Sequence, residues 1–148
     1  MRTYSEVKIL PYTPEQLYAL VVDVEKYPEF IPWCRAARIV SREKDSFLGE
    51  LIVSFSHLTE RYTSRVTPIA PSDKTEGRID VALVSGPFHH LNNHWRFVPH
   101  VDGCEIHLDL DFKFKSKLLD TLIGGLFGRA CEKMVGAFTA RAAVLYST

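Results

Sequence analysis

The chain has 148 residues, the size of one ordinary domain, and it leaves no room for two. Hydrophobic residues make up 46% and charged residues 24%, a mixture typical of a folded globular chain, so intrinsic disorder is excluded. Eighteen basic and eighteen acidic residues cancel, which argues against binding DNA through overall charge and leaves only a local patch for electrostatic binding. We therefore expect a single domain over residues 1–148.

The spacing of the cysteines and the pattern of the N-terminal residues indicate the cellular compartment of the protein. Cys34, Cys104 and Cys131 lie far apart and form no CxxC pair, which predicts free thiols in a reducing compartment. The residues from Tyr4 to Lys8 alternate like a strand, so a secretory signal is not expected. The longest stretch of low charge, Leu118 to Gly128, is too short to cross a bilayer. We expect a cytoplasmic protein, at most peripheral to a membrane.

The first part of the chain predicts a strand and then a helix. Residues 3–10 alternate and indicate the strand. Thr13 suits the N-cap of the helix, a proline follows at its first position, and Gln16 completes a capping box. Pro28 ends this region, and residues 27–33 are expected to form a turn or a short second helix. Spacings of three, four and seven give the first helix one apolar stripe: Leu17, Leu20, Val21 and Val24.

From residue 35 to 114 the apolar pattern repeats every two residues, which indicates strands. In the last of them the residues from Ile106 to Phe114 place apolar side chains on one face and polar ones on the other, as in an antiparallel sheet with one wet face. Residues 116–146 predict one long helix. This order predicts an α+β fold, an antiparallel sheet of about seven strands curled around a terminal helix. The expected strands after the first helix are 35–43, 47–56, 60–69, 76–84, 91–98 and 104–114.

The final helix is more apolar than a helix on a single surface needs to be. At about 100° per residue, its apolar side chains cover an arc of roughly 200°, about twice the usual width. More than one side must be covered, by a strongly curved sheet, a bound lipid, a partner or a membrane surface. The helix also contains four glycines: Gly124, Gly125, Gly128 and Gly136. They predict a tight contact with a strand, open space beside the helix, or a break near Gly124-Gly125. The arc contains Leu118, Leu122, Leu126, Ala130, Met134, Ala137, Phe138 and Leu145.

Motifs for catalysis and metal binding are missing from the sequence. There is no GxSxG nucleophile elbow, and His89, His90 and His94 lack the convergent spacing of an HExxH helix. Asp109 and Asp111 lie two apart on the wet face of a strand, so we expect them to be solvated and not to form an acid/base pair. We therefore predict no catalytic residue and no metal site.

The two faces of the predicted sheet suggest different roles. On the outer face, Arg61, Arg65 and Arg96 form a candidate basic stripe, although neighbouring acids predict an ordinary solvated face. On the inner face, a curved sheet against a wide apolar helix fits either a filled core or a pocket for a water-insoluble ligand. Residue patterns alone leave both possibilities open.

Several blocks of residues occur in the order found in a known family. They are Tyr27 to Cys34, Tyr62 to Val66, Gly86-Pro87-Phe88 with Leu91, Trp95 to Phe97 with Pro99, Phe112 to Leu119, and Ala137 to Tyr146. In these blocks, which span nearly the whole chain, the sequence resembles the coenzyme Q-binding START-like proteins of the polyketide cyclase/dehydrase and lipid-transport superfamily. The resemblance implies a helix-grip fold, in which a seven-stranded antiparallel sheet wraps a long C-terminal helix around an apolar cavity.

The resemblance also implies a function. It implies ubiquinone (coenzyme Q) or a related polyisoprenoid lipid as bound ligand, no other cofactor, and a non-enzymatic carrier or chaperone role in respiration and quinone biosynthesis. The implied partners are respiratory or quinone-biosynthesis proteins and, transiently, the inner membrane surface. One alternative is a ribosome-association toxin acting on the large subunit, as described for a bacterial relative, which predicts an outward arginine cluster. Another is a cyclase/dehydrase-type enzyme, which would need convergent polar residues in the cavity.

On the carrier hypothesis the cavity must be largely apolar, because burying an isoprenoid tail contributes about 25 cal/mol per Å². Tyr62, Ser64, Asn93 and Trp95 are candidates to hold the quinone carbonyls, since they lie in alternating strands beside apolar neighbours. The segment from Phe30 to Trp33, with Phe88 in its Gly-Pro loop, is expected at the mouth. The full set of expected ligand-binding residues is Phe30, Trp33, Tyr62, Ser64, Phe88, Trp95, Phe112, Phe114, Leu122, Phe127 and Met134.

Overall fold

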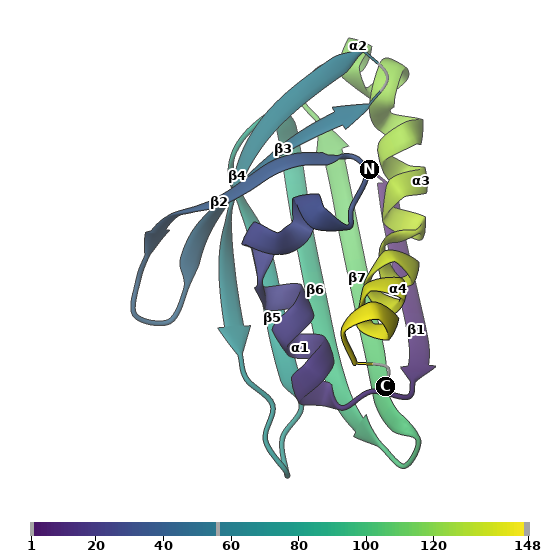
Figure 1. The fold of residues 1–148 in the computed structure, drawn as a ribbon. Coiled ribbons are helices and arrows are strands. Elements are labelled where there is room, and N and C mark those ends of the chain that lie inside the picture. Colours follow the sequence, from purple (N-terminus) through teal and green to yellow (C-terminus); the bar gives the residue numbers. More distant parts are fainter. Residues whose placement is uncertain (1, 56, 147–148) are drawn as a thin grey trace.

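A computed structural model describes residues 2–55 and 57–146 (Figure 1). A seven-stranded antiparallel sheet in the order β1-β7-β6-β5-β4-β3-β2 curls around the C-terminal helices, which confirms the expected α+β helix-grip architecture. All the predicted strands are present. The strands are β1 (Arg2–Leu10), β2 (Cys34–Arg42), β3 (Phe47–Phe55), β4 (Leu58–Ile69), β5 (Gly77–Ser85), β6 (Phe88–His100) and β7 (Gly103–Phe114).

Two short helices follow β1 on the concave side of the sheet (Figure 1). Helix α1 (Pro14–Val22) begins with the predicted capping box: Gln16 N–H donates to Thr13 Oγ1 at 3.1 Å, and Thr13 N–H donates to Gln16 Oε1 at 3.0 Å. The 3₁₀ helix η1 (Val24–Glu29) occupies the predicted turn region. The predicted apolar stripe is buried from Leu17 to Val24, so α1 and η1 close one side of the interior.

The prediction of one continuous C-terminal helix is wrong. The segment is divided into α2 (Lys117–Leu119), a π-helical turn η2 (Asp120–Gly124), α3 (Gly125–Glu132) and α4 (Met134–Tyr146). The π turn ends where the glycine pair predicted a break. A second interruption lies at Lys133, whose backbone has φ −94° and ψ 0°. Because a π turn contains an extra residue, it shifts the helical phase, and the residues before it leave the apolar arc of α3.

That phase shift explains two of three exposed leucines, Leu118 and Leu122, while Leu145 lies beyond the second interruption at Lys133. Leu118, Leu122 and Leu145 were expected on the buried arc, but they are 68%, 53% and 49% exposed. Of the three alternatives for the glycines, the structure has open space at Gly128 and Gly136, where a Cβ would meet nothing within 4 Å. Close approach is real at Gly124, where a Cβ would lie 2.9 Å from Arg2 Nη2.

An aromatic cluster fills the interior next to η2 and α3. Its centre is Phe127, whose ring centroid lies 4.6 to 5.8 Å from those of four other phenylalanines. Most pairs are tilted or edge-on, the geometry that aromatic quadrupoles favour. This cluster is tightly packed, so any internal space must lie on its other side, toward α1. The four partners are Phe55, Phe88, Phe112 and Phe114.

Candidate ligand cavity

An enclosed cavity of about 80 Å³ lies between the concave face of the sheet and the helices. Its wall is almost entirely apolar and combines residues from α1, η1, strands β3 to β7, α3 and the start of α4. The alternation of the strands explains this lining, since every second residue of β4 and β6 points inward. The lining residues are Val21, Val24, Tyr27, Ile31, Trp33, Gly49, Leu51, Tyr62, Ser64, Val66, Ile79, Val81, Leu91, Asn93, Trp95, Leu110, Phe127, Cys131 and Met134.

Two polar atoms in this wall lack a hydrogen-bond partner. Ser64 Oγ and Asn93 Oδ1 are buried and make no hydrogen bond within the part of the chain that the structure describes. Ser64 is only 4% exposed. An unsatisfied buried polar group costs about 1–3 kcal/mol, so in native proteins such a group is usually paired with an ordered water or a bound ligand. The cavity can therefore hold an apolar molecule that carries an oxygen or hydroxyl group.

The ionisable groups in the wall are uncharged at neutral pH. Burial raises the pKa of the Tyr27 and Tyr62 hydroxyls above the ordinary value. Tyr27 donates its hydrogen bond to the Val21 carbonyl, and Tyr62 packs edge-on against Phe88 with ring centroids 5.2 Å apart. Burial also raises the pKa of the Cys131 thiol to about 12. Without a thiolate or a charged base, the cavity suits binding better than covalent chemistry.

The other two cysteines are equally unreactive. Cys34 and Cys104 are buried and free, and burial raises the pKa of each thiol to about 11. Across residues 2–55 and 57–146, no three side chains of His, Cys, Asp or Glu come together as a metal site would require.

An open groove lies on the surface beside the cavity. It has a volume of about 980 Å³ and follows α3 and the start of α4, opposite the segment from Phe30 to Trp33. Ile31, Trp33 and Met134 line both the groove and the cavity. A single layer of side chains therefore separates the interior from the surface at this point. Met134 also directly follows the interruption at Lys133, where α3 ends.

The structure brings together some of the sequence-predicted site residues. Trp33, Tyr62, Ser64, Trp95, Phe127 and Met134 line the cavity, and Phe30 lines the groove. Phe88, Phe112 and Phe114 are buried in the aromatic cluster, outside the cavity wall. Phe88 is 1% exposed because its ring packs against those of Tyr62, Phe114 and Phe127, so the prediction that it lies at the mouth is wrong. Leu122 is 53% exposed and does not line the cavity.

Sequence reasoning missed several wall residues, including Tyr27, Leu51, Val81 and Leu91. Two of them, Leu91 and Val81, are related to predicted residues by strand alternation and by strand pairing. Leu91 lies two residues before Asn93 and four before Trp95, so all three share one face of β6. Val81 is the direct cross-strand neighbour of Asn93. The register needed for the second inference is not visible in the sequence.

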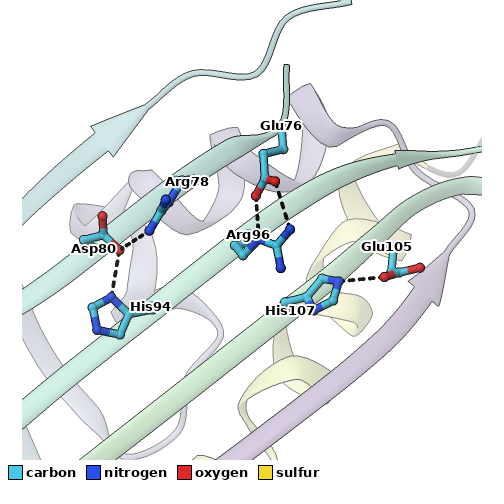
Figure 2. Close-up of polar contacts among 7 residues, drawn as sticks. All are labelled: Glu76, Arg78, Asp80, His94, Arg96, Glu105 and His107. Carbon is cyan, nitrogen blue, oxygen red and sulfur yellow. Dashed lines mark hydrogen bonds and ion pairs between the residues drawn. The ribbon is translucent and has the colours of Figure 1, made fainter. Parts of the chain in front are cut away.

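The outer face of β5 to β7 is covered by paired charges rather than a basic stripe. Figure 2 shows Arg96 donating to both oxygens of Glu76, at 2.6 and 2.9 Å, and Asp80 lying between His94 and Arg78. His107 lies 2.6 Å from Glu105. The solvated face expected from the sequence is therefore what the structure contains on β5 to β7.

Comparisons with known proteins cover nearly the whole chain. Residues 10–139 match a family model described as polyketide cyclase / dehydrase and lipid transport. The chain is 43% identical over 142 residues to the ribosome association toxin RatA of Rickettsia prowazekii, covering 96% of this chain and 97% of that protein. It is 35% identical over 147 residues to the mitochondrial coenzyme Q-binding protein COQ10 homolog B of Xenopus laevis, covering 97% of this chain and 59% of that protein. The solution structure of the 18 kDa protein CC1736 from Caulobacter crescentus is 39% identical, with a TM-score of 0.76 and 100% coverage of both chains.

Proposed function

The chain belongs to the polyketide cyclase/dehydrase and lipid transport family, and from this premise we propose that it binds ubiquinone or a related polyisoprenoid quinone and acts as a carrier, not an enzyme. One observation carries the proposal: the apolar cavity contains two buried polar atoms, Ser64 Oγ and Asn93 Oδ1, that lack partners in the described chain. A quinone ring is flat and apolar and bears oxygens at its edge. The Ser64 hydroxyl donates a hydrogen bond to a ring carbonyl, and Asn93 Oδ1, which can only accept, pairs with a ring hydroxyl when the bound ligand is the reduced quinol.

The size of the cavity determines how a long ligand is bound. About 80 Å³ is well below the roughly 300–1,000 Å³ of pockets that enclose a whole ligand. We infer that the head group enters by displacing the wall formed by Trp33 and Met134, and that the isoprenoid tail lies in the groove outside. Methionine suits such a wall because its unbranched side chain repacks at low cost.

The lack of a suitable acid or base in the cavity supports a carrier over a cyclase or dehydrase. Such an enzyme needs groups that exchange protons near neutral pH. Burial instead moves the pKa of Tyr27, Tyr62 and Cys131 upward, away from neutrality. Delivery of the quinone to respiratory or quinone-biosynthesis proteins, from the cytoplasmic side of a membrane, is the role that fits these properties.

The first test is organic extraction and mass spectrometry of the purified protein, followed by titration with a short-chain ubiquinone. The two tryptophans of the chain, Trp33 and Trp95, both line the cavity, so bound quinone is expected to quench most of the intrinsic fluorescence. Quenching should saturate near one quinone per protein. A preparation that contains no quinone and shows no saturable quenching would overturn the proposal.

A second candidate function is association with the large ribosomal subunit, which is favoured by one surface feature. Arg38 and Arg61 share a single carboxylate, that of Glu50, at 2.9 and 3.9 Å. This leaves a net positive charge on the outer face of β2 to β4, beside the exposed Arg35 and Arg42. RNA phosphates bind such arginines in a salt-dependent way. Co-sedimentation with large subunits that fails at high salt, and fails for Arg38→Glu/Arg61→Glu, would support it.

A further inference from the structure

We propose that one end of the molecule is a docking tip for anionic lipid bilayers. The docking tip consists of Lys113, Lys115 and Lys117 with the exposed leucines Leu118 and Leu122. Its purpose depends on the proposed carrier function, since a carrier must meet the bilayer that holds its ligand. Its existence is tested separately below.

The leucines are the first observation. Leu118 and Leu122 lie one helical turn apart on α2 and η2, with 68% and 53% of their surfaces in water. They are the residues that the π turn moves off the buried arc. In Figure 1, α2 lies at one end of the molecule, and the last residues of α4 lie at the opposite end. Two neighbouring leucines on one exposed turn form an apolar surface that is left uncovered by residues 2–55 and 57–146.

The lysines are the second observation. Lys113, Lys115 and Lys117 are exposed, and among residues 2–55 and 57–146 none of them forms an ion pair. They line an open groove of about 680 Å³ beside the leucines. The acidic residue in this groove, Asp120, is already paired with Arg2 at 3.3 Å. The groove therefore keeps a positive charge that is not neutralised by its own carboxylate.

Charge and apolarity together identify the partner. An interfacial segment that binds anionic membranes combines lysines at headgroup level with large apolar side chains that enter the acyl region. Single-stranded RNA would require aromatic stacking surfaces, and the aromatic residues lining this groove, Phe112 and Phe114, are buried. Among the described residues, no helix has the length and apolarity to cross a bilayer, so binding at the surface is the mode proposed.

The docking tip also lies on the path to the ligand site. Leu126 is one turn after Leu122 along the helix and lines the groove that reaches Trp33 and Met134. A lipid that leaves the bilayer at the tip would therefore follow α3 to the thin wall of the cavity.

The test is flotation with two kinds of vesicle, one of phosphatidylcholine alone and one that also contains phosphatidylglycerol. The native protein is expected to float only with the second kind, and less at high salt. Leu118→Ser/Leu122→Ser and Lys115→Glu/Lys117→Glu should each weaken binding by about tenfold or more. Two matched controls should leave binding unchanged: Val144→Ser/Leu145→Ser at the end of α4, and Lys44→Glu/Lys74→Glu in loops between strands.

Each outcome is decisive for one proposal. A protein that binds quinone but floats with neither vesicle overturns the docking tip and leaves the carrier function standing. A protein that floats through the tip but binds no quinone overturns the carrier function and supports the tip. If the leucine variant instead converts a dimer to a monomer, the surface is an interface between copies of the chain and the membrane proposal is wrong.

Discussion

Arg141 on α4 binds Glu29 at the end of η1, with Nη2 donating to Oε1 at 2.9 Å. The same guanidinium lies 5.2 Å from the centre of the Phe30 ring. Arg141 thus links the C-terminal helix to the segment that separates the cavity from the surface groove. The contact closes one side of the proposed ligand path, and its strength should influence how fast a ligand enters and leaves.

Replacing this arginine should accelerate ligand exchange. Arg141→Met keeps an apolar stem against Phe30 but removes the link to Glu29. We expect association and dissociation of a short-chain quinone to become severalfold faster, with little change in affinity, as measured by stopped-flow tryptophan fluorescence. Lys26→Met is the matched control, because Lys26 also pairs with Glu29, at 3.6 Å, from within η1 itself. Equal effects of the two changes would contradict a link across the path.

Lowering the pH should also accelerate ligand exchange. The hydrogen bond from Arg141, followed by the charges of Lys26 and Arg141, lowers the pKa of Glu29. A lowered pKa means that the contact stabilises the folded state above the ordinary glutamate value of about 4.3 and is lost as pH falls through the lower folded value. Quinone dissociation from the native protein should accelerate in that acidic window, whereas Arg141→Met should show no such rise. Identical pH profiles would rule out Glu29 as the titrating group.

Removing the polar atoms from the cavity should stabilise the protein and weaken ligand binding. Ser64→Ala and Asn93→Leu each delete a buried atom without a partner, so we expect the free energy of unfolding to rise by about 1–2 kcal/mol. Quinone affinity should fall in the same variants. Urea unfolding and fluorescence titration measure the two effects. As controls, Thr63→Ala and Asn92→Leu change the adjacent residues on the outer face of the same strands, and they should neither raise stability nor weaken quinone binding. If Ser64→Ala instead lowers both stability and affinity, the role of Ser64 is purely structural.

Replacing Gly128 in α3 with alanine should stabilise the protein. A Cβ at Gly128 meets nothing within 4 Å, and alanine exceeds glycine in helix propensity by about 1 kcal/mol. Gly128→Ala should therefore raise the melting temperature by about 2–4 °C. If the weak helix assists opening of the cavity wall, quinone exchange should slow in the same variant. A lower melting temperature would mean that the glycine has a packing role that the structure does not contain.

The cavity thiol offers a direct measure of opening. Cys131 lies in the wall and is protonated, since burial raises its pKa to about 12. Labelling by a thiol reagent at neutral pH should be slow and limited by opening of the wall. Saturating quinone should slow it further, while labelling of Cys104, which does not line the cavity, should not respond to ligand. Equal protection of both thiols would indicate a global effect on stability instead.

Much of the fold could be predicted because its patterns are local. The alternation from Ile106 to Phe114 and the capping box at Thr13 each depend on a few neighbouring residues, and both are present in the structure. The position of Leu122 could not be predicted in this way. A strict 3.6-residue period places it on the buried arc, but the π turn at Asp120–Gly124 shifts the phase. The Gly124 backbone in that turn packs closely against Arg2, a residue at the other end of the chain.

The site was only partly predictable for a related reason. Phe112 and Phe127 are both buried aromatic residues that face inward, but only Phe127 lines the cavity. Which aromatic ring fills the core and which borders an empty space depends on the curvature of the sheet and on where α3 crosses it. Neither property can be obtained from the pattern of one strand or helix.

The pairing of β1 with β7, which aligns Arg2 with Phe112, also constrains how the protein is made. The first strand of the sheet, β1, pairs only with the last, β7, so it has no partner until the five strands between them have been synthesised. Until then β1 is an unpaired edge, and its contacts with the C-terminal segment, such as Tyr4 with the Glu132 carbonyl, cannot form. Contacts so distant along the chain slow folding, so β1 should stay exposed to chaperones until β7 has been synthesised and the sheet can close.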